Sequence, residues 1–118
     1  MCGILGFIGS SVSSVDLSIL AHRGPDSSGH VFVEKNNVFL GHTRLAIQDL
    51  SESGAQPMTS ASGRFIVSFN GEIYNHLELR ELASLNPGYE WQGSSDTETL
   101  ITCFELLGIE ATIEMCEG

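Results

Sequence analysis

The chain has 118 residues, the usual size of one domain, and 42% of them are hydrophobic, which excludes a disordered tail and indicates a globular fold. Its formal net charge is −10, from 15 acidic and 5 basic residues. Nucleic acid and anionic membranes bind clustered cations, so the composition argues against both partners. The basic residues are scattered along the chain: Arg23, Lys35, Arg44, Arg64 and Arg80.

The cysteines and the apolar segments predict a cytoplasmic protein. Cys2, Cys103 and Cys116 form no metal-type pair, and one would be left over if two were bridged. The apolar run 4–8 is too short for a signal peptide and lacks a basic flank. No apolar stretch approaches the ~18 residues of a membrane span. We therefore expect free thiols in a reducing compartment, and no membrane association.

The first part of the chain predicts a strand, a short helix and a loop. Residues 3–8 alternate small and apolar side chains, which is typical of a buried strand, although chain termini generally fray unless something holds them. Residues 15–20 are a short helix candidate with Ser14 or Asp16 near its start. The segment HRGPDSSG, residues 22–29, is dense in turn-forming residues and predicts a loop.

The middle of the chain predicts strands separated by a turn and a long loop. β-Branched and aromatic residues occupy 31–34 and 38–47 on either side of an Asn-Asn pair, a pattern that indicates a hairpin. Residues 49–63 contain serines, glycines and a proline and predict a long loop. The sequence RFIVSF, residues 64–69, alternates as a strand and runs directly into NGEIYN.

The last part of the chain predicts helices. Residues 76–85 carry apolar side chains at helical spacing and end at Asn-Pro-Gly. A second helix is expected over 97–107 with Asp96 as its N-cap, and a third begins near Glu110. Strands followed by helices predict an α+β domain, with helices packed on antiparallel sheet. Because no polar tail follows, we expect the chain to be a piece of a longer domain.

Cys2 admits two interpretations. A small residue after Met1 permits removal of the initiator, which would leave a thiol and a free α-amine on one residue. A terminal amine titrates near about 7.7–8.0, so a fraction is neutral at cellular pH and can take the thiol proton directly or through water. Gly3 leaves the backbone room for a ligand. The alternative is a cysteine that follows Met1 by chance.

Asn70 and Gly71 stand at the end of the strand predicted over 64–69. A side-chain amide beside a glycine N–H offers two donors to a developing oxyanion, and such donors commonly contribute ~10²–10³ in rate. The alternative is an ordinary Asn-Gly turn. That alternative is weakened because apolar Ile73 and Tyr74 continue without a clear returning strand.

Arg44 and Asp96 are charged residues that also admit structural interpretations. Arg44 lies inside the apolar segment LGHTRLAI, where it either extends to solvent or holds an anion. A guanidinium suits bidentate recognition of a carboxylate. Asp96 either caps a helix or binds an ammonium group.

Six motifs occur along the chain in this order: MCGILGFIG, HRGPDSSG, GHTRLAIQDL, GAQPM, FNGEIYNH and SSDTE. Together they resemble the glutaminase domain of class II glutamine amidotransferases, a family of N-terminal nucleophile hydrolases. The branch to which they are most similar is that of the asparagine synthetases. The resemblance spans Met1 to about Leu107, and so many ordered matches make a chance resemblance negligible.

The resemblance implies a role for each candidate residue. Cys2 would attack the side-chain amide of glutamine, releasing ammonia and leaving a glutamyl thioester that water resolves. The Asn70 side chain and the Gly71 N–H would form the oxyanion hole. The loop from Arg23 to Asp26 would be structural or gating. The implied substrate contacts are Arg44 for the α-carboxylate, Glu72 and Asp96 for the α-ammonium group, and the backbones of Leu45 and Ile47.

The resemblance also implies a fold and partners. Family glutaminase domains are longer than this chain and stack two antiparallel sheets between helical layers, a four-layer αββα sandwich, so residues 1–118 would be a partial domain that takes L-glutamine. Hydrolysis would need no metal and no nucleotide. ATP and magnesium would serve only a synthetase domain that makes asparagine from aspartate, and this sequence lacks its Gly-rich phosphate loop.

Several alternatives follow from the same resemblance. The ammonia acceptor could instead be another compound, such as a sugar acid, or the chain could be a catalytically silent binding module. A sandwich cut partway leaves strand edges uncovered, so a homodimer or aggregation, and activity below that of the intact domain, are further expectations. Leu40, Ile66 and Phe69 would then lie close to a surface.

Overall fold

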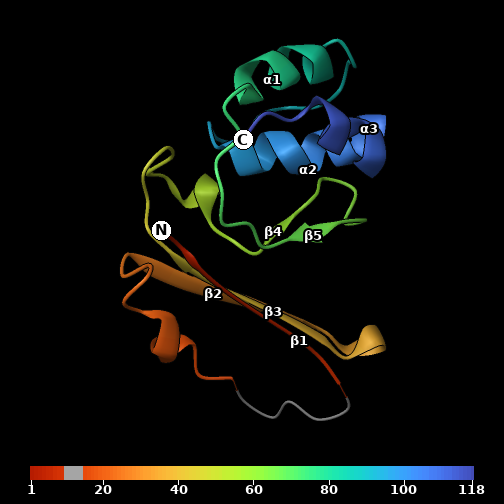
Figure 1. Cartoon of the computed structure of the whole chain (residues 1–118). Helices are drawn as coiled ribbons and strands as arrows, with labels where there is room; N and C mark the ends of the chain where they lie inside the picture. Colours follow the sequence, from red (N-terminus) through yellow and green to blue (C-terminus); the bar gives the residue numbers. More distant parts are fainter. Residues whose placement is uncertain (10–14) are drawn as a thin grey trace.

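The computed structural model describes residues 1–9 and 15–118 and shows an α+β arrangement, which confirms the predicted class. A three-stranded antiparallel sheet occupies one end of the molecule and the helices the other, with a small two-stranded sheet between them (Figure 1). The strands are β1 (Gly3–Ile8), β2 (Ser27–Val33), β3 (Val38–Arg44), β4 (Met58–Thr59) and β5 (Ile66–Val67). The helices are α1 (His76–Ser84), α2 (Asp96–Leu107) and α3 (Ile109–Met115), with 3₁₀ turns η1 (Leu17–Leu20), η2 (Glu34–Asn36) and η3 (Glu52–Gly54).

The three-stranded sheet has the order β1-β3-β2 and sets which side chains share a face. Gly3 pairs with Thr43, and Ile4 with His42. Because side chains alternate between the faces of a strand, Cys2 continues the face that carries His42 and Arg44. The opposite face packs on η1, where the Thr43 hydroxyl donates to the Leu20 carbonyl at 3.1 Å. The sheet therefore directs Cys2 and Arg44 to the same side.

The first predicted helix and loop differ in extent from the structure. Residues 17–20 form a 3₁₀ turn, with the Asp16 carboxylate accepting from the Ser18 N–H at 2.9 Å; Ser14 lies outside the described residues. The loop predicted over 22–29 ends earlier, because Ser27 and Ser28 already pair with β3. Turn-forming residues do not prevent pairing when a partner strand is present.

The predicted strand over 38–47 ends at Arg44 instead of Ile47. The chain turns there because the Asp26 N–H donates to the Arg44 carbonyl at 3.0 Å, and the Asp26 carboxylate accepts from the Ala46 N–H at 2.8 Å. The strand predicted over 64–69 is also shorter, since only β5 pairs, with β4 inside the predicted long loop. The first correction arises from contacts of Asp26 with a distant part of the chain. The second arises because the β4–β5 hairpin pairs only two residues of each strand.

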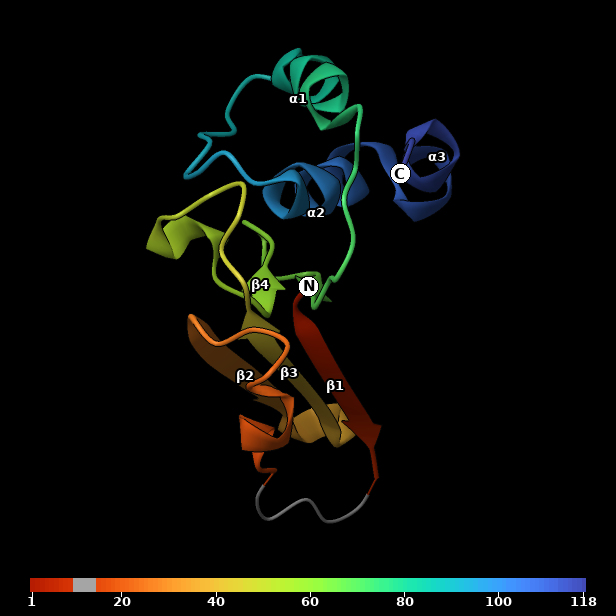
Figure 2. The ribbon, with the colours of Figure 1, turned by 60° about the vertical axis from the view of Figure 1, so that its left-hand side comes forward.

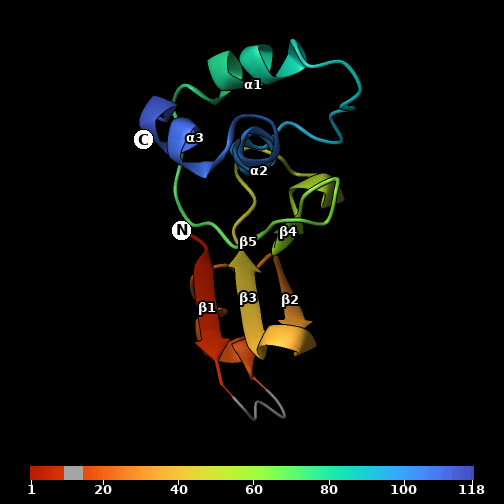
Figure 3. The same ribbon diagram turned by 90° about the vertical axis from the view of Figure 1, so that its right-hand side faces the viewer.

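The helices pack around a small apolar core. Its buried residues are Ile73, Leu79, Ala83, Leu100 and Cys103. Burial raises the pKa of the Cys103 thiol to about 11, so this thiol stays protonated. In Figures 2 and 3 the chain begins at the end of β1 that is nearer the helices, beside the small β4–β5 sheet. The N-terminal residues thus lie at the junction of the three parts.

Apolar surface remains exposed on the three-stranded sheet, as Ile8 is 79% exposed. Leu40, Ile66 and Phe69 are half-buried.

Among the described residues, no helix has the length and apolarity needed to cross a bilayer.

Candidate functional site

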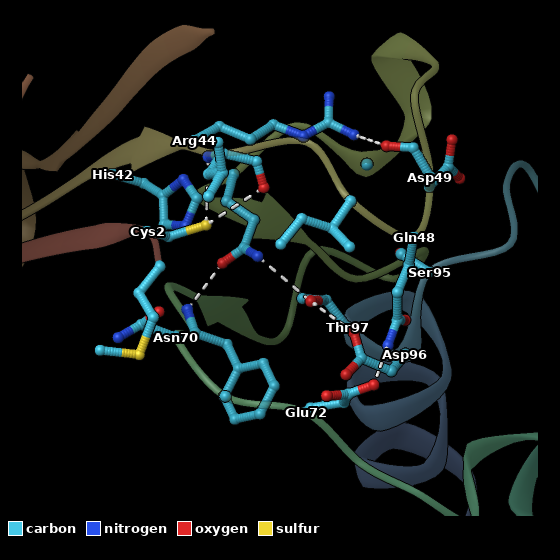
Figure 4. A pocket seen from close by; sticks show the side chains of 17 residues that line it. Cys2, His42, Arg44, Gln48, Asp49, Asn70, Glu72, Ser95, Asp96 and Thr97 are labelled. Atoms are coloured by element: carbon cyan, nitrogen blue, oxygen red, sulfur yellow. Dashed lines mark hydrogen bonds between the residues drawn. The ribbon is translucent and has the colours of Figure 1, made fainter. Parts of the chain in front are cut away.

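A cavity of about 310 Å³ opens where the end of the three-stranded sheet meets β4–β5 and the start of α2 (Figure 4). It collects residues that are far apart in the sequence, from the N-terminus to α2. Every site residue predicted from the sequence lines it: Cys2, Arg44, Leu45, Ile47, Asn70, Gly71, Glu72 and Asp96. The arrangement is that of a binding pocket with a thiol at one wall and charged groups around it.

Cys2 is held in the pocket wall by backbone contacts. The Leu45 N–H donates to its sulfur at 3.3 Å, and the thiol lies 3.7 Å from the Leu45 carbonyl. The Arg23 guanidinium donates to the Cys2 carbonyl at 3.1 Å, so the HRGPD loop fastens the terminus that would otherwise fray. Met1 is 74% exposed and also lines the cavity. Its removal would place an α-amine on the residue that bears the thiol.

Arg44 is buried, with 9% of its surface exposed, so the interpretation in which it extends to solvent is wrong. Its guanidinium donates to the Ser51 carbonyl at 2.8 Å and to the Asp49 carbonyl. A guanidinium has five N–H donors, and these two bonds leave others for a ligand in the cavity. Arg44 therefore provides an oriented cation at the pocket wall.

Asn70 and Gly71 follow β5 in an exposed bend beside the cavity. No hydrogen bond within the described part of the chain engages the Asn70 amide, which leaves it free to donate to a ligand. The preceding residue is fixed, because the Phe69 N–H donates to the Gln56 side chain at 2.6 Å. A hydrogen bond therefore fixes the backbone directly before the Asn70–Gly71 pair.

Glu72 and Asp96 bring two carboxylates to the cavity. Gln48 donates to Glu72 at 3.2 Å, and the Asp96 carboxylate accepts from the Ile73 N–H at 3.0 Å. The prediction that Asp96 caps α2 is wrong. Ser95 is the N-cap, since its hydroxyl accepts from the Glu98 N–H at 3.2 Å. Because the Ser95 hydroxyl provides the cap, the Asp96 carboxylate is not used for capping and lies beside the cavity in the first turn of α2.

Six polar residues that line the cavity were not predicted from the sequence: His42, Gln48, Asp49, Gln56, Ser95 and Thr97. The Gln56 amide connects the Phe69 backbone to the Thr97 hydroxyl at 3.1 Å, which joins the Asn-Gly bend to α2. Asp49 and His42 also line the cavity. Gln56 lies in the recognised motif GAQPM and Asp49 in GHTRLAIQDL, so membership of a motif was the only signal that could have found them.

His42 is a buried imidazole, 1% exposed, and neither ring nitrogen has a hydrogen-bond partner among the described residues. Burial lowers its pKa below 6.5, the nearby Phe69 backbone acts in the opposite direction, and the Arg44 charge lowers it further. The neutral ring therefore adds no charge beside Cys2.

The lowered pKa of His42 predicts loss of stability in acid. Below pH 6.5 the unfolded chain binds a proton at this ring that the folded chain does not, so the free energy of unfolding falls as pH decreases toward the folded-state pKa. Each unit of pKa difference contributes about 1.4 kcal/mol. We expect His42→Gln to flatten this limb of a pH series of chemical denaturation, and His22→Gln, at an exposed site, to leave it unchanged. An identical slope in both variants would contradict the assignment.

The described residues contain no group of three or more His, Cys, Asp and Glu side chains placed to hold a metal ion. The three cysteines are free thiols. The groups that line the pocket are a thiol, amide donors, one oriented cation, an imidazole and the carboxylates of Asp49, Glu72 and Asp96.

Known proteins are similar to this chain over most or all of its length. The model of the glutamine amidotransferase domain matches residues 1–118. The chain is 45% identical over 92 residues to the glutamine-hydrolysing asparagine synthetase 1 of Saccharomyces cerevisiae, covering 78% of this chain and 15% of that protein. It is 40% identical over 126 residues to the glutamine-hydrolysing asparagine synthetase of Triphysaria versicolor, covering 100% of this chain and 20% of that protein.

A relative with a different name is similar over much of the same region. The chain is 36% identical over 126 residues to the amidase chry2 of Gibberella zeae, covering 92% of this chain and 18% of that protein. The chain thus spans a fifth or less of the length of these three relatives. Since the family model matches from the first residue to the last, the chain belongs to the family of glutamine amidotransferase domains.

Proposed function

We propose that the chain hydrolyses glutamine to glutamate and ammonia, with Cys2 as the nucleophile. One observation carries this proposal: a single cavity gathers the Cys2 thiol, the Asn70–Gly71 donors, the Arg44 guanidinium and two carboxylates. A substrate with an amide at one end and an α-carboxylate and α-ammonium group at the other matches this set. Family membership, shown over the whole chain, supports the same substrate.

The chemistry proceeds in two balanced steps. After removal of Met1, the α-amine of Cys2 accepts the thiol proton, and the thiolate attacks the amide carbon of glutamine. The oxyanion accepts hydrogen bonds from the Asn70 amide and the Gly71 N–H. The C–N bond breaks, the nitrogen takes the proton from the α-amine, and ammonia leaves. Water then attacks the thioester, which yields glutamate and restores the thiol.

The charged side chains of the cavity recognise the end of glutamine that carries the α-carboxylate and the α-ammonium group. The free donors of Arg44 bind the α-carboxylate, while Glu72 and Asp96 bind the α-ammonium group. The backbones of Leu45 and Ile47 supply further contacts. These steps use a thiol, an amine and hydrogen bonds, so we propose that hydrolysis itself requires neither metal nor nucleotide.

We further propose that the ammonia passes to a synthetase domain, which would use ATP and magnesium to convert aspartate into asparagine. Two relatives named as glutamine-hydrolysing asparagine synthetases, each several times longer than this chain, support this role. Residues 1–118 would then form part of the four-layer αββα sandwich, in a reducing cytoplasm that keeps the cysteines free. In isolation, the exposed apolar face of the three-stranded sheet would favour a homodimer.

The acceptor can be tested with isotopically labelled glutamine. The protein, as its gene encodes it, is supplied with amide-¹⁵N glutamine, aspartate, ATP and magnesium, and products are followed by mass spectrometry. We expect glutamate and ¹⁵N-asparagine to form together. Glutamate formed without labelled asparagine would instead favour another ammonia acceptor, such as a sugar acid. No glutamate at all would mean a catalytically silent module.

A further inference from the structure

Asp49 is a buried carboxylate in the pocket wall, 8% exposed, that none of the roles above uses. One of its oxygens accepts from the Ser51 N–H at 2.8 Å and from the Ser51 hydroxyl at 2.6 Å. The other accepts from the Ser94 N–H at 2.7 Å. Its carboxylate therefore joins two segments that are 45 residues apart in the sequence.

The bonds to Ser51 fold the segment that holds Arg44. They close a tight turn, and in that turn the carbonyls of Asp49 and Ser51 both accept from the Arg44 guanidinium. The Ser51 hydroxyl also caps η3 by accepting from the Ser53 N–H at 3.2 Å. The position of the guanidinium thus depends on a turn that the Asp49 carboxylate keeps closed.

The bond to Ser94 fixes the start of α2. Ser94 lies two residues before Asp96, and Ser95 between them is the N-cap of the helix. The preceding backbone is held in the same way by Glu98, which accepts from the Gln92 N–H at 2.7 Å and the Gly93 N–H at 2.9 Å. Asp49 therefore connects the cation of the pocket, Arg44, to the carboxylate of Asp96.

Two glycines allow this close packing. A Cβ atom at Gly54 would overlap the Arg44 guanidinium and lie 3.2 Å from the Asp49 side chain. A Cβ atom at Gly93 would overlap the Asp49 carboxylate. Because both guanidinium and carboxylate are enclosed on these sides, they have little freedom to move.

We infer that Asp49 is a positioning residue that fixes the separation of Arg44 and Asp96 and thereby selects ligands with an α-carboxylate beside an α-ammonium group. This inference rests on the proposed function. The Ser51 hydroxyl and the Ser94 N–H, with the Ser51 N–H, lower the pKa of Asp49 to about 2, so the carboxylate stays charged at every pH at which an enzyme of this kind works.

The inference is tested by comparing glutamine with 4-aminobutanamide, which is glutamine without its α-carboxylate. In the protein as its gene encodes it, Asp49→Asn places an amide N–H₂ where the Ser51 donors or the Ser94 N–H need an acceptor. We expect KM for glutamine to rise about tenfold with little change in kcat, because a charge-assisted contact to the α-carboxylate is misplaced. The ratio of kcat/KM for glutamine to that for 4-aminobutanamide should fall by a similar factor.

Two further variants keep the test decisive. Gly54→Ala places a methyl group against the Arg44 guanidinium and should lower the same ratio, even if Asp49→Asn fails to fold. Glu105→Gln is the matched control. Glu105 also accepts from serines, the Ser60 hydroxyl at 2.5 Å and the Ser62 N–H at 3.1 Å, but it does not line the cavity. It should leave the ratio unchanged.

Binding of both compounds to the Cys2→Ala protein, measured by calorimetry, separates this inference from the proposed function. If Asp49→Asn, added to the Cys2→Ala protein, weakens the binding of glutamine but not that of 4-aminobutanamide, the inference is supported. Equal loss for both compounds, no loss in D49N and G54A, or the same loss in E105Q overturns it while leaving glutamine hydrolysis standing. If the parent protein neither binds nor hydrolyses glutamine, the proposed function and the inference both fail.

Discussion

Cys2→Ala is expected to abolish glutamine hydrolysis, with a decrease in kcat of at least about 10⁴-fold, comparable to the removal of other enzymatic nucleophiles. Alanine has no atom that can attack the amide carbon, and the pocket offers no second thiol, because Cys103 and Cys116 do not line it. The fold should survive, since alanine removes only the weak hydrogen bonds between the sulfur and the backbone of Leu45. Ammonia release and the thermal unfolding midpoint measure the two parts of the prediction.

Cys116→Ala is the matched control for this variant. Cys116 is a half-buried thiol packed against the helical core, and burial raises its pKa, which disfavours the reactive thiolate. Its replacement should leave ammonia release within about twofold, as substitutions far from a site do when the site is untouched. Intact mass of the parent protein should show that Met1 has been removed. Ammonia release that persists in the Cys2→Ala protein would refute the nucleophile.

Arg44→Ala and Asp96→Ala are each expected to raise KM for glutamine by more than about tenfold, with smaller effects on kcat. Each removes the partner of one charged group of the substrate, and an unpaired charge in a closed pocket is costly, by several kcal/mol in the extreme. Arg44→Ala also leaves two carbonyls without donors, and Asp96→Ala leaves the Ile73 N–H without an acceptor. Both variants should therefore also unfold at lower temperature.

The control for the arginine is Arg64→Ala. Arg64 is exposed and stacks over the Phe65 ring, 4.9 Å from its centroid, away from the cavity. Its loss should change neither KM nor kcat appreciably. If Arg44→Ala or Asp96→Ala kept the KM of the parent protein while losing stability, that residue would have only a structural role, as a support for the 49–51 turn or for the Ile73 backbone.

Local sequence patterns predicted the helices well and the short strands poorly. The helix expected over 76–85 is α1, and that expected over 97–107 is α2, each within one residue at its ends. Apolar spacing and the residues at helix ends are local signals that predict such elements. The β4–β5 pair could not be predicted, because its hairpin depends on Glu105 of α2, which accepts from the Ser60 hydroxyl 45 residues earlier in the chain.

The candidate site was predicted through its resemblance to a family more than from the physics of single residues. Taken separately, Arg44 and Asp96 each had a plausible structural interpretation. Burial excludes that of Arg44, and the Ser95 cap excludes that of Asp96. Asp49 and Gln56 escaped prediction because their partners, Ser94 and Thr97, are 45 and 41 residues away. An acidic or amide side chain in a polar loop gives no local sign that it will be enclosed by another segment.

Because β1 pairs with β3 in a fixed register, the number of residues in β1 decides which face of the sheet carries Cys2. Gly3 lies opposite Thr43, and this register is what carries Cys2 to the face of Arg44. Deleting one residue within β1 would turn the thiol to the face covered by η1, since the side-chain period of a strand is two. Deleting two would restore the face but draw the sulfur back to the position opposite His42, away from the Leu45 backbone. Insertions and deletions in this strand should therefore be incompatible with catalysis even where the sheet tolerates them.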